Sequence, residues 1–327
     1  MNVMAAKDEQ LVTIRHLLTN CGSLAAHDRV LILCDPVTHD LAEAFRVQAT
    51  AIAAHAQLIE ITGQTRHGEE PSAAAAAAMC DASLIISLCR YSLAHSRARI
   101  EAGKAGARFL SMPDYDWGLL HDPCLRFDYR AQAPVVRRIA DALTHAKTIH
   151  VTTAAGTDIR MSAEDRIGNY CPGFVERPGD LGSPPDIEAN VSPIETSAEG
   201  RAVIDGSITC GEFGLLDTPM ILDIVAGKVV VIQNARRANA DIMEGIFGPI
   251  GSKRRVLAEC GIGLNPLAKL TGAMLTDEGT LGCIHFGFGA NHTVGGKNEV
   301  DFHLDFVMRK PTLVVDGVTL MRDGELC

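Results

Sequence analysis

The chain has 327 residues, of which 47% are hydrophobic and 21% are charged, and its formal net charge is −10. This length is typical of two domains, and an acidic chain without a basic run is excluded from the common classes of nucleic-acid-binding protein. Only 5% of the residues are aromatic, which argues against a base-stacking platform.

The N-terminal segment lacks the apolar core of a secretory signal, because Lys7, Asp8 and Glu9 lie within its first ten residues. No apolar stretch in the sequence reaches the roughly 18–20 residues that cross a bilayer. The ten cysteines occur singly and never at CxxC spacing, which is typical of reduced, buried thiols and not of a zinc knuckle. The sequence therefore predicts a cytoplasmic protein with no membrane segment.

The first 150 residues alternate short apolar runs with Ala-rich segments of helical period. Continuous apolar runs are typical of strands that are buried on both faces of a sheet. The predicted strands are residues 29–34, 57–62, 83–88, 108–112 and 147–151, and the predicted helices are residues 39–55, 71–80, 93–105 and 133–145. This alternation predicts an α/β doubly wound domain at residues 1–150 with a mostly parallel sheet.

Two nucleotide-binding motifs are missing from this half of the sequence. The first predicted strand ends in Asp35-Pro36 and not in a GxGxxG turn, and no GxxxxGK[ST] loop occurs anywhere in the chain. A dinucleotide cofactor and a P-loop nucleotide site therefore have no support from the sequence.

The composition changes near residue 150. Residues 152–200 are rich in Gly, Pro, Ser and Asp, which is typical of loops between short strands. The strand-like runs that follow are 201–204, 220–225, 228–232, 282–289, 300–308, 312–315 and 318–321, with helices at 237–246 and 252–260 and hairpin turns at Ala226-Gly227 and Asp316-Gly317. This pattern predicts an α+β domain at residues 151–327 with an antiparallel sheet that carries a metal site.

The sharpest chemical pattern is the segment 301–306, DFHLDF. Residues i and i+2 of a strand project to the same face, so His303 and Asp305 would lie side by side with Leu304 and Phe306 on the opposite face. An imidazole and a carboxylate on one rigid face can bind a divalent cation. The alternative is a polar pair in which Asp305 only orients His303.

Three more ligand-type side chains occur in glycine-rich segments of the same half. His285 lies in an otherwise apolar strand, where an imidazole without a partner would be costly. Glu259 precedes a glycine-rich segment that we expect to follow a helix, and it could instead pair with a neighbouring arginine. Glu212 lies between glycines and could instead be a solvated hairpin residue. Together with the pair above, they supply the ligands of a carboxylate-rich site for one or two metals.

These segments, together with Gly156-Thr157-Asp158, resemble the aminopeptidase T (thermophilic leucyl metalloaminopeptidase) family. The resemblance implies two divalent metals, such as zinc, cobalt or manganese. Glu212 would bridge both, Glu259 and His285 would complete one site, and His303 and Asp305 the other. It also implies a homo-oligomer that hydrolyses an amide or other C–N bond of a small molecule or peptide.

The segments 197–200 and 293–297, which precede His303-Leu304-Asp305, are similar to a second branch of that superfamily, which holds 2,5-dihydroxypyridine 5,6-dioxygenase. This resemblance implies one iron(II) ion held by two His and one Asp, and a hydroxylated N-heterocycle as the substrate. His303 and Asp305 match that triad, whereas the position of the remaining His is Glu259 here.

The residues alone favour the hydrolase, because all five candidate ligands are present. In the hydrolase, either Glu259 or His292 would transfer the catalytic proton. The resemblance implies that His292 occupies the position of a Tyr in the peptidases. We also expect Lys297 and Arg309 to lie near the metal and to bind a substrate carboxylate, although both could simply be solvated. The iron(II) dioxygenase, and a binding protein that has lost its metal, remain as alternatives.

Overall fold

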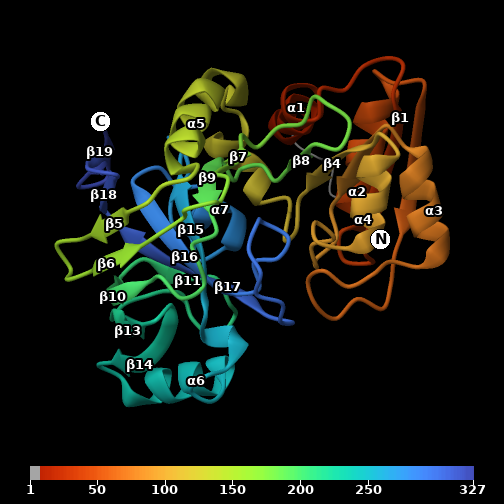
Figure 1. The fold of residues 1–327 in the computed structure, drawn as a ribbon. Coiled ribbons are helices and arrows are strands. Elements are labelled where there is room, and N and C mark those ends of the chain that lie inside the picture. Colours follow the sequence, from red (N-terminus) through yellow and green to blue (C-terminus); the bar gives the residue numbers. More distant parts are fainter. Residues whose placement is uncertain (1–7) are drawn as a thin grey trace. The chain divides into compact units, whose positions relative to one another are not determined.

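The computed structural model describes residues 8–327, and the chain divides into two units (Figure 1). Residues 8–131 and Pro172–Pro185 form the first unit, and Gln132–Cys171 and Asp186–Cys327 form the second. This division differs from the predicted boundary at residue 150, because the chain leaves the first unit earlier and later returns to it for one short strand. Among the described residues, no helix has the length and apolarity needed to cross a membrane.

The first unit is built on a parallel sheet with the strand order β2-β1-β3-β4-β8. The strands are β1 (Arg29–Cys34), β2 (His55–Glu60), β3 (Leu84–Ser87), β4 (Arg108–Ser111) and β8 (Leu181–Gly182). The helices are α1 (Asp8–His16), α2 (His39–Thr50), α3 (Ala73–Asp81) and α4 (Arg97–Lys104). The predicted α/β class of this part of the chain is confirmed, and the short strand β8 comes from a segment that the sequence analysis assigned to the second half.

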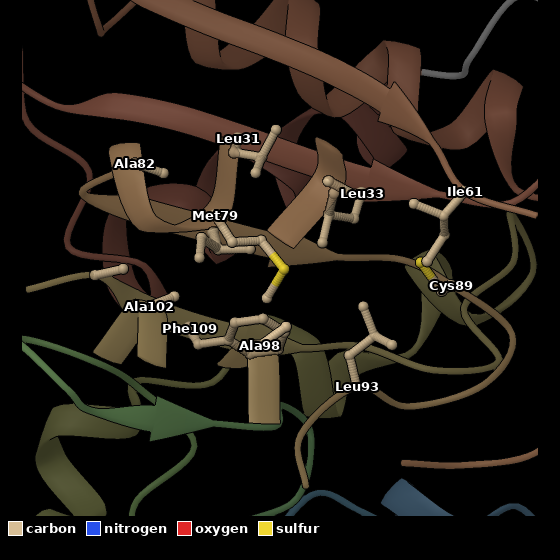
Figure 2. Close-up of a cluster of buried hydrophobic side chains, with 13 residues drawn as sticks. Leu31, Leu33, Ile61, Met79, Ala82, Cys89, Leu93, Ala98, Ala102 and Phe109 are labelled. Atoms are coloured by element: carbon tan, nitrogen blue, oxygen red, sulfur yellow. The ribbon is translucent and has the colours of Figure 1, made fainter. Parts of the chain in front are cut away.

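Alternating strand residues and the small residues of two helices form a core of this unit (Figure 2). Leu31 and Leu33 lie two positions apart on β1, so both side chains point to the same face of the sheet. Met79 of α3 and Ala102 of α4 are buried in the same cluster, beside Phe109 of β4. The Ala-rich helices thus pack closely on the sheet because they carry few bulky side chains.

The second unit contains two antiparallel sheets. One has the order β14-β13-β10-β6-β5-β18-β19-β20, and the other, which we call the central sheet, has the order β12-β11-β17-β16-β15-β9-β7. The strands of the first are β5 (Ile149–Thr152), β6 (Asp158–Met161), β10 (Glu199–Ile204), β13 (Met220–Val225), β14 (Lys228–Asn234), β18 (Thr312–Val315), β19 (Val318–Arg322) and β20 (Glu325–Leu326). Those of the central sheet are β7 (Asn169–Cys171), β9 (Glu188–Val191), β11 (Ser207–Ile208), β12 (Gly214–Leu215), β15 (Leu257–Gly263), β16 (Cys283–Gly289) and β17 (His303–Arg309). The predicted antiparallel class is confirmed.

Two predicted elements of this unit are wrong in kind or place. The strand predicted at 147–151 is β5, which pairs with β6 and β18 in an antiparallel sheet and does not extend the parallel one. The helix predicted at 252–260 is a short 3-10 turn, Lys253–Arg255, followed by β15. All seven residues of β15 are buried, because β9 and β16 flank it and both of its faces are covered, and such a strand shows no alternating pattern.

One face of the central sheet packs against α6 (Arg237–Phe247) through aromatic rings. Phe247 of α6 lies 5.6 Å from Phe306 of β17 and 5.5 Å from Phe288 of β16, between ring centroids. Phe288 and Phe306 are 5.1 Å apart in an edge-to-face arrangement. Because side chains alternate along a strand, this packing directs the neighbouring polar residues of β17 to the opposite face.

We expect Phe306→Ala to lower the free energy of unfolding by about 3–5 kcal/mol, because it removes a fully buried ring from this cluster. Urea denaturation followed by circular dichroism measures the loss. The matched control is Ile242→Ala on α6, whose side chain is 44% exposed and should cost about 1 kcal/mol or less. Equal losses in the two variants would contradict this account of the core.

Candidate metal centre

The candidate ligands project from adjacent strands of the central sheet onto the face opposite the aromatic cluster. The pairing of β16 with β17 sets Gly287 opposite Asp305 and Gly289 opposite His303. The pairing of β15 with β16 sets Glu259 opposite Gly287. Since directly opposed residues of an antiparallel pair share a face, Glu259 and Asp305 flank Gly287 on one side of the sheet.

Glu259, His303 and Asp305 form one group of potential ligands, whose donor atoms all lie within 4.8 Å of one another. His303 Nε2 lies 3.2 Å from Asp305 Oδ1 and 3.3 Å from Glu259 Oε2. The side chains of Glu259 and Asp305 are only 9% and 8% exposed, whereas that of His303 is 32% exposed. This group is therefore open to solvent at His303 and closed at its carboxylates.

Glu259 also belongs to a second group, with Glu188 and His285, whose donor atoms likewise lie within 4.8 Å. His285 Nε2 is 3.2 Å from Glu188 Oε2, and both side chains are buried. Because the two groups share one carboxylate, the structure offers positions for one cation or for two neighbouring cations.

Two glycines provide the space into which the histidine rings extend. A Cβ atom on Gly261 of β15 would lie 2.1 Å from His285 Nε2, and one on Gly287 would lie 2.8 Å from His303 Nε2. Real Cβ atoms do not approach other atoms so closely, so any side chain at these positions would displace the rings. The glycines near Glu259 and His285 in the sequence are therefore part of the site's geometry.

Four buried polar atoms in or near the second group lack a hydrogen-bond partner. They are Glu188 Oε2, His285 Nδ1, Asp186 Oδ1 and Glu278 Oε1. Burial first, and then the charges of neighbouring carboxylates, raise the pKa of Asp186, Glu188 and Glu278 well above their ordinary values. An excess of buried negative charge with orphaned oxygen atoms is the environment that a divalent cation satisfies, so the residues present fit a metal ion.

The backbone fixes the tautomer of His303. Its Nδ1 lies 2.8 Å from the carbonyl oxygen of Ala290, which can only accept, so Nδ1 carries the proton and Nε2 faces the carboxylates. Burial alone would lower the pKa of His303, but Asp305 and Glu259 outweigh it and hold that pKa well above its ordinary value. Burial likewise opposes ionisation of Asp305, but His303 overcomes it and lowers the pKa of that carboxyl to about 2.

Of the five predicted ligands, the structure brings four into these groups and leaves Glu212 outside both. Glu212 is exposed on the segment between β11 and β12. The carboxylate beside Glu259 and His285 is instead Glu188 of β9. Its signal in the sequence is the alternation of polar and apolar residues at 186–191, DIEANV, which the surrounding turn-rich composition obscured. In the alternative, Glu259 would pair with a neighbouring arginine, but Arg255 binds Glu244 instead.

The other predicted site residues, His292, Lys297 and Arg309, belong to neither ligand group. His292 and Lys297 are exposed on the loop between β16 and β17, where the backbone N–H of Lys297 donates to Glu195 at 2.6 Å. Arg309 is six residues from His303 along an extended strand, a separation of about 20 Å. Its backbone N–H and its Nε bind Asp205, so the predicted position of Arg309 near the metal is not found.

Comparison with known proteins identifies the family. The model of the 2,5-dihydroxypyridine 5,6-dioxygenase (NicX) family matches residues 12–327. The chain belongs to this family. A 2,5-dihydroxypyridine 5,6-dioxygenase of Pseudomonas putida is 26% identical to it in an alignment over 198 residues. The alignment covers 56% of this chain and 55% of that relative, so the chain spans about half of the relative's length.

Two solved structures share the fold over nearly the whole chain. The structure of the 2,5-dihydroxypyridine dioxygenase of Pseudomonas putida KT2440 superimposes with a TM-score of 0.82 and 21% sequence identity. The superposition covers 97% of this chain and 96% of the dioxygenase chain. The structure of wild-type AmpT from Thermus thermophilus superimposes with a TM-score of 0.72 and 14% sequence identity, and the superposition covers 98% of this chain and 100% of the AmpT chain. The predicted resemblance to the dioxygenase branch is confirmed by the family match, and the likeness to AmpT shows that the two chains share a fold. These matches make the chain a member of an enzyme family and favour the dioxygenase over the hydrolase that the residues alone suggested.

We expect Gly261→Ala to weaken divalent-cation binding by at least about tenfold, because the new Cβ displaces the His285 ring. Isothermal titration of the metal-free protein with Mn²⁺ measures the effect. Gly245→Ala is the matched control, since a Cβ at this position on α6 meets no atom within 4 Å. Equal cation affinities in the two variants would show that the ring position over Gly261 is unimportant.

We expect the metal-free protein to lose stability as the pH rises from about 5 to about 8. Asp186, Glu188, Glu278 and His303 all have a raised pKa in the folded state, so they stabilise it while protonated and that stability is lost on deprotonation. Asp305, whose pKa is about 2, opposes this trend only at lower pH. Thermal denaturation at the two pH values measures the loss.

Excess Mn²⁺ should restore most of the thermal stability at the higher pH, because the cation replaces the missing protons as the partner of the carboxylates. Glu188→Gln provides the control, since it removes one of the repelling charges and should flatten the pH dependence of the metal-free protein. A melting temperature that rises with pH in the absence of metal would refute the electrostatic description of the site.

Proposed function

We propose that this protein is a metal-dependent ring-cleavage dioxygenase that acts on a hydroxylated N-heterocycle, such as 2,5-dihydroxypyridine. The observation that carries the proposal is the family match, which extends over residues 12–327 and includes every member of both ligand groups. The solvent-open side of the group formed by Glu259, His303 and Asp305 adds support, because ring cleavage needs vacant positions for the substrate and oxygen.

Glu259, His303 and Asp305 would hold the catalytic cation, and iron(II) bound there would supply oxygen activation and chelation of the substrate's hydroxyl group. The protein's own contribution is preorganisation. The hydrogen bond from His303 Nδ1 to Ala290 directs Nε2 toward the cation position. Asp305, whose pKa is about 2, is ionised at neutral pH, whereas burial raises the pKa of Glu278, which hydrogen-bonds to it, well above its ordinary value. This hydrogen bond helps to hold the Asp305 carboxylate in place.

A second candidate, a metal-dependent hydrolase of amide or other C–N bonds, is favoured by one specific observation. Both ligand groups contain one His and two carboxylates, and they share Glu259. A shared carboxylate between two oxygen-rich groups suits two neighbouring cations that polarise a carbonyl and activate water. The described residues form no group of two His and one carboxylate, which is the usual iron(II) facial triad.

One comparison of activities separates the two candidates. Metal-free protein is reloaded with Fe²⁺ under anaerobic conditions and given 2,5-dihydroxypyridine and air in an oxygen electrode. In parallel, protein loaded with Zn²⁺, Mn²⁺ or Co²⁺ is given amides and short peptides, and amine release is measured. We expect oxygen uptake that matches the loss of the ring's ultraviolet absorbance. Amine release without oxygen uptake would overturn the dioxygenase proposal in favour of the hydrolase.

We expect His303→Ala and Asp305→Ala to reduce the activity by roughly two orders of magnitude or more and to lower the affinity for the cation, because each removes a ligand. His27→Ala, an exposed position in the first unit, is the control and should retain full activity.

Glu188→Gln distinguishes a site with one bound cation from a site with two. With one catalytic cation it should retain bound iron and measurable activity, whereas with two it should lose both one equivalent of metal and the activity.

A further inference from the structure

Three ligand-type side chains meet in the first unit, where β1 and β2 end. Cys34 is the last residue of β1 and Glu60 is the last residue of β2, and parallel pairing sets them directly side by side. His39 is the first residue of α2, the helix that follows β1. The donor atoms of Cys34, His39 and Glu60 all lie within 4.8 Å of one another, and His39 Nδ1 is 2.9 Å from Glu60 Oε2.

The turn that returns the chain from β1 to α2 is fixed by Asp35. Its Oδ1 accepts hydrogen bonds from the backbone N–H groups of Val37 and Thr38, at 2.9 and 3.1 Å. Its Oδ2 accepts from the backbone N–H of Arg90, at 2.6 Å. This loop therefore places His39 by backbone geometry and not only by its ion pair with Glu60, which is a form of preorganisation.

We propose that Cys34, His39 and Glu60 form a cation site in the first unit, separate from the candidate metal centre, that takes zinc or a similar borderline cation. Thiolate and imidazole ligands together select zinc-like cations over calcium or magnesium. Three protein ligands leave a fourth tetrahedral position for water or another small ligand. The Cys34 side chain is buried, whereas those of His39 and Glu60 are 47% and 40% exposed, so the cation has access from the solvent side.

The local charge agrees with this assignment. Burial, and then the negative charges of Glu60 and Asp35, raise the pKa of Cys34 to about 12. The charges that disfavour a free thiolate there are the ones that attract a cation. On binding, the thiol proton leaves to solvent and the sulfur coordinates the cation in its place. The ion pair between His39 and Glu60 is then replaced by two metal–ligand bonds.

Cobalt(II) titration of the full-length, chelator-treated protein tests the proposal, because a cobalt–thiolate bond absorbs in the near ultraviolet. We expect a band whose final intensity corresponds to one thiolate-bound cobalt per chain, that disappears on addition of Zn²⁺, and that is lost in Cys34→Ser. Cys171→Ser is the matched control, since Cys171 lies near Glu188 in the second unit and tests for a thiolate at the candidate metal centre. The band should survive this change.

Two surface variants keep the test decisive if Cys34→Ser fails to fold. His39→Ala and Glu60→Gln each remove one exposed ligand, and each should weaken the cobalt affinity of the thiolate band by about tenfold or more. No thiolate band in the wild-type protein, a band that survives Cys34→Ser, or an unchanged affinity in both surface variants would overturn the proposal. The readout is spectroscopic, so its outcome does not depend on which reaction the second unit catalyses.

Discussion

The feature on which the second unit depends is the burial of negative charge on one face of the central sheet. Asp186, Glu188, Glu259 and Asp305 are all buried, and after burial itself the charges of Glu259 and Asp305 help to raise the pKa of Asp186 and Glu188. Like charges out of water are strongly unfavourable unless protons or cations compensate them. Protons or a cation must therefore compensate these carboxylates, and we expect a bound metal ion to stabilise this face of the sheet.

Two properties of the sheet make this concentration of charge possible. The aromatic cluster of Phe247, Phe288 and Phe306 binds the opposite face, which fixes the orientation of every second residue on β16 and β17. Glycines then stand beside the ligand residues, so the histidine rings can lie over the neighbouring strand. A slip of one residue in the register would exchange the two faces, placing rings in the metal site and carboxylates in the core.

The parts of the fold that follow from local pattern could be predicted from the sequence. Strands β1, β3 and β4 are continuous apolar runs between segments of helical period, and the alternation around His303 and Asp305 showed which face each residue occupies. Three features could not be read in this way. β15 is buried along its whole length and its sequence, LAECGIG, does not alternate between polar and apolar residues, so it was mistaken for a helix. β5 joins a sheet through partners distant in the sequence, and Glu188 lies in a turn-rich segment where a strand of four residues gives a weak signal.

The ligand set bears directly on the choice between the two proposed functions. Glu259 belongs to both groups, so the charge of this one side chain decides how many cations the face can hold. With a neutral imidazole at position 259, the ligands would carry less negative charge and would suit a single iron(II) ion. With the carboxylate, the ligands can compensate the charge of two cations or bind one cation more strongly. In this chain the carboxylate is combined with a family match to ring-cleaving enzymes. In our proposal, the number of cations that Glu259 and Glu188 allow this face to bind connects the geometry of the site to the class of reaction.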